Sequence, residues 1–171
     1  QAEISNYDFR WEFYFDSDRV SDLFAISPFY KTIDSPIIAA ELSSPDTVRY
    51  GYGNVDSATL KGIEFDYRQS LSFLKNAWED FYWTVNLTLV ESEVDTNNPN
   101  FSTTSINLRD GESLTGQAPV VFNYSVGYDN PDSGLNFALL YNFVGERIVA
   151  LGKGTEPNTD LSSTHQLDFV I

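Results

Sequence analysis

The stretch FYWTVNLTLVESE, residues 81–93, alternates between two kinds of side chain. The odd positions are large and apolar, and the even positions are polar or amphipathic: Phe81, Trp83, Val85, Leu87 and Leu89 against Tyr82, Thr84, Asn86 and Thr88. A period of two is typical of a β-strand whose faces meet different surroundings. Those surroundings are either a protein core and bulk water, or lipid and a wet lumen, and the two cases imply different functions.

Other segments alternate in the same way, so the sequence predicts an all-β, antiparallel meander of about seven long strands. Pro28 weakens the second of these strands, and we expect it to mark a bulge. The segments are 4–16, 19–33, 57–72, 78–94, 119–130, 134–149 and 165–171, with a further short strand near 36–41.

The lengths of the strands and of their connections favour a membrane barrel. Several predicted strands span about 14–16 residues, whereas strands of soluble proteins usually have about 5–6 and membrane strands need about 9–11. Short connections alternate with long ones along the chain. This pattern is typical of outer-membrane barrels, with short turns on one rim and long loops on the other. The short connections are 16–19, 73–77 and 130–134, and the long ones are 34–56, 95–118 and 150–162.

Composition excludes several classes of protein. The 171 residues carry 10 basic and 25 acidic side chains, for a net charge of -15, which argues against a nucleic-acid surface. No apolar run approaches the roughly 18 residues of a membrane-spanning helix. The chain has no Met and starts with Gln, so we expect a fragment of a larger protein.

Several segments resemble the β-barrel of TonB-dependent outer-membrane receptors. The run LKGIEFDYRQSLSFL (60–74) is similar to a recurrent barrel strand that descends to a periplasmic turn, and YDFRWEFYF (7–15) with FYKTIDSPI (29–37) looks like the hairpin before it. LTGQAPVVFNYSVGYDNPDSGLNFALLYNFVGERI (114–148) and HQLDFVI (165–171) resemble later strands. The resemblance covers nearly the whole chain and keeps its order.

The resemblance implies that residues 1–171 form a portion of a transmembrane β-barrel of about 22 strands. It implies that the plug domain, the TonB box and the last strands are absent from this chain. Such a receptor lies in the cell outer membrane of a Gram-negative bacterium and imports a scarce nutrient, such as a siderophore, vitamin or saccharide. Its partners are outer-membrane lipid, a nutrient captured by external loops, and TonB acting through the plug. It is not an enzyme, and no cofactor is expected.

The barrel interpretation assigns roles to two sets of side chains. Aromatic residues are expected at the periplasmic membrane interface, where rings meet acyl chains and polar edges meet headgroups. Ionisable residues at alternate positions must face the lumen, because charges are costly in lipid. The interface set is Trp11, Phe13, Phe15, Trp78, Phe81 and Trp83, and the lumen set is Asp8, Arg10, Glu12, Glu64, Asp66 and Arg68.

Catalytic and metal-binding alternatives find little support in the sequence. His165 is the single histidine and cysteine is absent, so a catalytic triad or a His/Cys metal centre lacks its residues. DTNNPN (95–100) has closely spaced oxygen ligands but not the full calcium-loop pattern. In GERI (145–148) we expect a rim turn with Glu146 inward and Arg147 outward.

One rival interpretation remains, a soluble extracellular β-sandwich that binds carbohydrate or protein. It predicts strands of about six residues and loops of similar length at both ends. For the barrel interpretation, an isolated piece of wall has two bare strand edges, and we expect it to self-associate through them.

Overall fold

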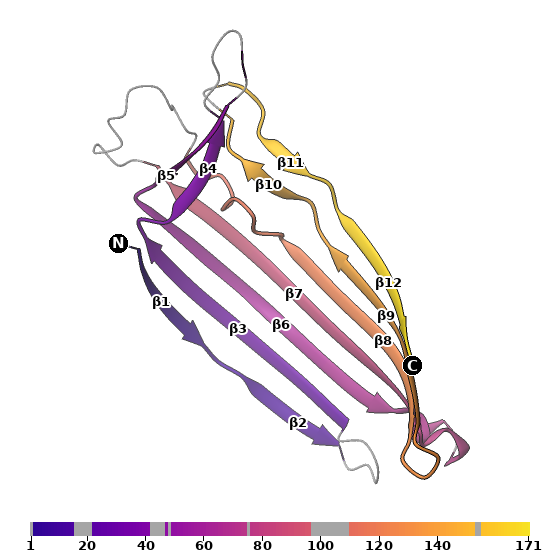
Figure 1. The fold of residues 1–171 in the computed structure, drawn as a ribbon. Helices are drawn as coiled ribbons and strands as arrows, with labels where there is room; N and C mark the ends of the chain where they lie inside the picture. The colour runs from indigo at the N-terminus through magenta and orange to yellow at the C-terminus, as the bar shows by residue number, and fades with distance from the viewer. Residues whose placement is uncertain are drawn as a thin grey trace.

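The computed structural model describes residues 2–15, 22–41, 47, 49–74, 76–96, 110–152 and 155–171. Its main element is one antiparallel sheet with the strand order β1-β3-β6-β7-β8-β9-β12, in which β2 also pairs with β3 (Figure 1). The predicted all-β meander is therefore confirmed. The sheet strands are β1 Glu3–Asp8, β2 Trp11–Phe15, β3 Asp22–Asp34, β6 Ser57–Ser70, β7 Phe81–Asp95, β8 Val120–Asn130, β9 Leu135–Val144 and β12 Thr164–Val170.

Two small hairpins accompany the main sheet. In one, β4 (Ile37–Glu41) pairs with β5 (Tyr50–Asn54), and in the other β10 (Arg147–Ala150) pairs with β11 (Thr159–Leu161). The sheet itself is open, with β1 and β2 on one edge and β12 on the other (Figure 1). No helix within the described ranges is long and apolar enough to cross a membrane.

Pro28 interrupts the neighbouring strand without producing the expected bulge. The backbone N–H of Phe9 donates to the carbonyl of Pro28 at 3.1 Å, but Pro28 has no N–H to return the bond. The segment predicted as one strand over 4–16 is therefore split into β1 and β2, which keep one register against β3. On the other side of β3, pairing with β6 runs through Pro28 and Ile63 without a shift.

The register aligns the alternating residues of every strand into two continuous faces. We call them the apolar face and the polar face. On β7 the apolar face carries the odd residues from Phe81 to Leu89, and the polar face carries the even ones. The apolar face continues through Tyr7, Trp11, Phe13, Phe24, Ile26, Ile63, Phe65, Tyr67, Val120, Phe122, Tyr124, Val126, Leu139, Tyr141, Leu167 and Phe169.

The two ends of the sheet differ. Residues 71–80 and 131–134 form short connections at one end, which we call the turn end, and the first contains the 3-10 turns η1 (Leu71–Phe73) and η2 (Asn76–Trp78). The predicted turn 16–19 lies outside the described residues. The described parts of the long connections, which include both small hairpins, gather at the opposite end, which we call the loop end (Figure 1).

The buried apolar cluster of the described residues lies at the loop end rather than in the middle of the sheet. Ala58 and Val94, a cross-strand pair on the polar face, pack with Ile38, Val55 and Leu151 from the long connections. Leu114 and Ile148 pack against this cluster. The long connections therefore fold over the polar face and form a small core there.

Local boundaries differ from the sequence prediction in three places. The connector expected at 73–77 extends over 71–80, so Trp78 lies in η2 and not at the start of a strand. The strand expected over 134–149 ends at Val144, and β10 leaves the main sheet to pair with β11. The short strand expected near 36–41 is β4, whereas its partner β5 was not predicted.

Candidate functional site

Five of the six residues expected at a membrane interface share the apolar face near the turn end. Trp11, Phe13 and Phe15 form one ring series on β2, and Phe81 and Trp83 begin β7. Tyr67 joins the two groups, with ring centroids 6.4 Å from Phe15 and 5.2 Å from Trp83. We call this set the aromatic belt: Trp11, Phe13, Phe15, Phe24, Tyr67, Phe81, Trp83, Tyr124, Tyr128 and Phe137.

Two aromatic residues near the belt do not lie on the apolar face of a strand. Trp78 lies in the turn before β7, exposed, so it is set apart from the strand positions of the belt. Tyr82 lies on the polar face, where the Arg68 guanidinium sits 5.0 Å from its ring centre. Within the belt, the indole Nε1 of Trp83 is buried without a hydrogen-bond partner.

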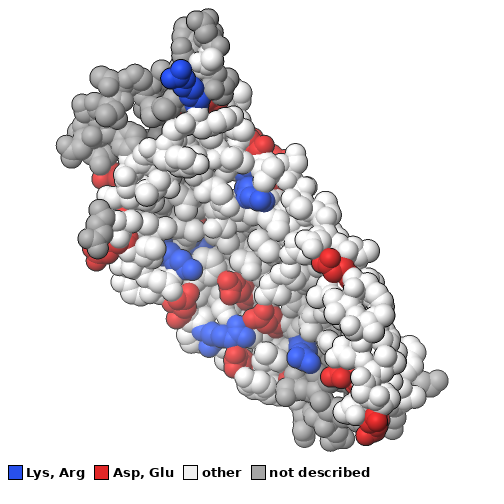
Figure 2. Space-filling model, in the orientation of Figure 1, with Lys and Arg blue, Asp and Glu red and all other residues white. Residues whose placement is uncertain are grey.

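All six expected charged residues lie on the polar face. The structure brings Arg10, Glu12 and Asp66 together, whereas Arg68 contacts Tyr82 and Asp8 accepts a bond from the Asn6 amide. Glu64 stands between Ser27 and Thr88 in the sheet register. Figure 2 shows acidic and basic side chains side by side over the lower part of the visible face.

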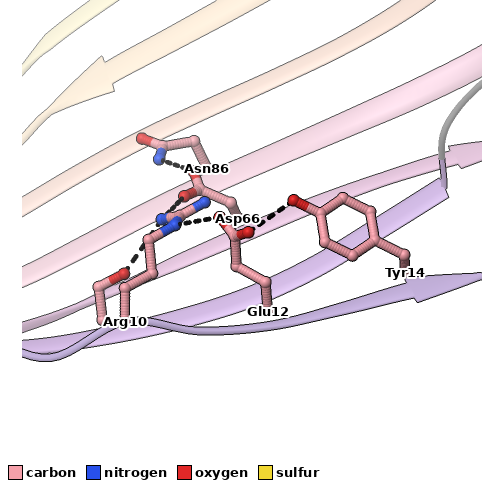
Figure 3. Close-up of polar contacts among 6 residues, drawn as sticks. Arg10, Glu12, Tyr14, Asp66 and Asn86 are labelled. Carbon is pink, nitrogen blue, oxygen red and sulfur yellow. Dashed lines mark hydrogen bonds and ion pairs between the residues drawn. The ribbon is translucent and has the colours of Figure 1, made fainter.

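Arg10 and Asp66 begin a chain of polar contacts that crosses the sheet (Figure 3). Arg10 lies 2.7 Å from Asp66, donates to Ser27, and pairs with Glu12, whose carboxylate also accepts from Tyr14. On the other side, side-chain amides donate in one direction: Asn142 to Asn123, Asn123 to Asn86, and Asn86 to Asp66.

We call this chain the amide ladder. It links side chains from the β1–β2 edge through β6, β7 and β8 to β9. One Arg10 bond and the three amide bonds run toward the Asp66 carboxylate, which accepts from both sides. Because successive hydrogen bonds polarise one another, the ladder favours one register across these strands.

Replacing Asp66 with alanine tests the ladder. Since the Arg10 and Asp66 side chains are 40% and 32% exposed, water replaces part of the lost contact. We therefore expect a loss of no more than about 1 kcal/mol of unfolding free energy. Asp66→Asn should lose less, because it keeps an acceptor for Asn86. Urea unfolding of the natural protein measures both, and Asp168→Ala, on the exposed contact with Gln166, is the matched control. Equal midpoints for Asp66→Ala and Asp168→Ala would contradict the ladder's role.

At the loop end, three long connections together form a groove of about 670 Å³, which we call the loop-end groove. Each of the predicted loops 34–56, 95–118 and 150–162 contributes to its wall. Tyr52 and Tyr50 are 82% and 56% exposed, although they belong to a paired strand. The lining residues are Ile37, Ala39, Tyr50, Tyr52, Thr115, Gly116, Arg147, Val149, Ala150, Thr159 and Leu161.

Backbone hydrogen bonds hold the groove walls in place. Leu151 joins the two small hairpins, since it donates to Ala39 at 3.1 Å and accepts from Glu41 at 2.9 Å. Gly116 donates to the carbonyl of Ile148 at 2.7 Å. Asn158 bridges two connections, because it accepts from Gly152 and donates to Glu112. These bonds fix the groove as a preformed surface.

Arg147 was expected on the outside of the rim, and this prediction is wrong. The side chain lines the groove and also a smaller cavity of about 160 Å³ that includes Val90 and Ser92 of the polar face. Its Nη1 is buried without a hydrogen-bond partner. Glu146, expected inward, is exposed and lines the same smaller cavity beside the polar face. The physical reason is that the chain leaves the main sheet at Gly145, so the alternation of β9 does not continue into β10.

The described residues contain no group of three or more His, Cys, Asp or Glu side chains placed to hold a metal ion. His165 lies on the apolar face of β12, where its Nδ1 is 2.8 Å from the Tyr141 hydroxyl. In DTNNPN, residues 97–100 lie outside the part of the chain that the structure describes.

Comparison with known proteins identifies a family for this arrangement. A family model described as TonB dependent receptor-like, beta-barrel matches residues 2–171. No curated protein and no solved structure matches the chain.

Proposed function

Because the chain belongs to the TonB-dependent receptor β-barrel family, we propose that it forms part of the wall of an outer-membrane receptor that imports a scarce nutrient. The observation that carries the proposal is the separation of the long sheet into an apolar and a polar face. In this proposal lipid covers the apolar face, and the polar face lines the lumen.

The dimensions of the apolar face support contact with lipid. The residues from Phe81 to Leu89 extend about 27 Å along the strand, at about 3.4 Å per residue. At a tilt of about 40° this gives about 21 Å of depth, close to the ~25 Å apolar band of outer-membrane barrels. An ion pair of 3.1 Å between Lys61 and Glu91 marks the loop-end limit of the band.

The aromatic belt marks the opposite limit, and we assign it to the periplasmic interface. Rings at this depth meet acyl chains, while polar edges reach headgroups. Trp78, in the turn, would lie farther toward the headgroups.

The polar face suits a lumen that contains water or protein. Charged side chains such as Arg10 and Asp66 would be costly in lipid, at about 2–4 kcal/mol for a basic residue at the midplane. Residues 1–171 would then be one portion of the barrel, with the plug domain and the TonB box elsewhere in the receptor. The loop-end groove would capture the nutrient, such as a siderophore, vitamin or saccharide, before TonB acts through the plug.

The soluble sandwich explains the structure less well. Within the described residues no second sheet covers the apolar face, where Leu167, Phe169 and Tyr7 are exposed. The strands are also long, with 14 residues in β6 and 15 in β7. The two open edges would pair with further strands in the receptor, and in isolation they would lead the chain to self-associate.

A cysteine scan tests the orientation of the sheet. This chain contains no cysteine, so single cysteines at 84, 85, 87 and 88 can carry a fluorophore in a receptor from which any cysteine outside this chain has been removed. After reconstitution in brominated lipid, we expect strong quenching for Val85→Cys and Leu87→Cys. Thr84→Cys and Thr88→Cys, on the polar face, serve as matched controls and should stay bright. Equal quenching at all four positions, or a receptor that stays in water without detergent, would contradict the proposal.

A further inference from the structure

The loop-end groove differs in charge from the rest of the molecule. The chain has a net charge of -15, yet no acidic side chain is among the described residues that line the groove. One cation, Arg147, lines it instead. On a strongly acidic chain, a preformed concave surface of this composition points to an anionic ligand rather than to a metal ion or a cationic ligand.

The state of Arg147 adds a second, independent observation. Its Nη1 is buried and has no hydrogen-bond acceptor. Glu146 and Asp160 line the smaller cavity on the other side of Arg147, but neither forms an ion pair with it among the described residues. A buried guanidinium N–H without an acceptor is costly, and a carboxylate in the groove would add a charge-assisted pair on the side of Arg147 that lines the groove.

The remaining wall favours a planar, apolar group. Tyr50 and Tyr52 expose their rings from one side of β5, and Ile37, Val149 and Leu161 are exposed beside them. Aromatic rings stack on flat ligands, and the hydroxyls of Thr115 and Thr159 offer polar contacts at the margin. The volume of about 670 Å³ lies within the range of about 300–1,000 Å³ for small-molecule sites.

We propose that the loop-end groove binds a small ligand that combines a carboxylate with a planar apolar ring. Arg147 pairs with the carboxylate, and Tyr50 and Tyr52 contact the ring. This inference rests on the proposed function, because it names the class of nutrient that the receptor captures.

The test compares two probes that differ in charge alone, 2-naphthoate and 2-naphthamide. Titration calorimetry of the full receptor in detergent should show that the carboxylate binds about tenfold or more tightly than the amide. Arg147→Gln should bring the two affinities together. Arg147→Lys should retain part of the preference for the carboxylate, because lysine keeps the positive charge but lacks the planar guanidinium that donates two parallel hydrogen bonds. Tyr52→Ala should weaken both probes by a similar factor. Lys61→Gln removes a cation outside the groove and is the matched control.

The difference between the affinities for 2-naphthoate and 2-naphthamide decides whether the proposal stands. Equal affinity of the wild-type receptor for both probes, no binding of either at millimolar concentration, or an unchanged preference in Arg147→Gln and Arg147→Lys would overturn the proposal. The proposed function fails separately, through the bromolipid experiment, which does not involve the groove. A receptor that shows alternating quenching without a preference for 2-naphthoate would retain its role as an outer-membrane importer and lose only this ligand class.

Discussion

We expect arginine in place of Leu87 to prevent stable assembly of the receptor in the outer membrane, whereas arginine in place of the adjacent Thr88 should leave assembly intact. Leu87 stands on the apolar face between Phe65 and Phe122, in the central part of the apolar band. At this depth a lipid-facing arginine costs about 2–4 kcal/mol. That is a large part of the about 5–15 kcal/mol that stabilises a typical protein.

Thr88 is the matched control because it lies one residue away on the polar face. Its register neighbours are Glu64 and Val121, so an arginine there gains a nearby carboxylate. Phe81→Arg, near the turn end of the band, should cost less than Leu87→Arg in lipid, because the cost of charge falls to about 0–1 kcal/mol near the interface. The measurement is the heat-modifiable gel shift in outer-membrane fractions. Equal loss of the shifted band for Leu87→Arg and Thr88→Arg would show that lipid does not cover this face.

The sequence was sufficient to predict the sheet because each long strand alternates over most of its length. In β7, the odd positions from Phe81 to Leu89 share one face and the even positions share the other, whereas toward the loop end the buried apolar pair Ala58 and Val94 lies on the polar face. The split between β1 and β2 was not predictable in this way. It results from Pro28 on the neighbouring strand β3. Pro28 has no backbone N–H, so one backbone hydrogen bond opposite Phe9 is missing.

The loop-end groove could be predicted only in part. The three long loops were expected to carry ligand contacts, and they do meet at one surface, but their residues gave no information about how they would pack. A signal for β5 exists in YGYGN (50–54), where Tyr50 and Tyr52 alternate with glycines. A signal for β10 also exists in IVAL (148–151), where a continuous apolar run replaces the odd-numbered alternation of β9. Both signals are short, and the partners that stabilise them are distant in the chain.

We expect Gly62→Ala to destabilise the receptor far more than its one added methyl group suggests. A Cβ at position 62 would lie 2.5 Å from the carbonyl oxygen of Leu89 and 2.4 Å from Cζ of Phe29. The Phe29 ring can rotate away, but the Leu89 carbonyl belongs to the backbone of the paired strand. Relief of the clash therefore requires displacement of the sheet itself, for which overpacking costs of about 3 kcal/mol are reasonable.

Gly127 provides the comparison between a clash with a movable side chain and a clash with the backbone of a paired strand. The nearest atoms to a Cβ there would all belong to the Tyr82 side chain, with its Cζ at 2.4 Å. Since a side chain can move, Gly127→Ala should cost about 1 kcal/mol, and Tyr82→Ala should relieve most of that cost in the double variant. Phe29→Ala should not rescue Gly62→Ala, because the Leu89 carbonyl remains. Urea midpoints of the single and double variants measure both cycles. Rescue of Gly62→Ala by Phe29→Ala would show that the ring, and not the strand backbone, requires glycine at position 62.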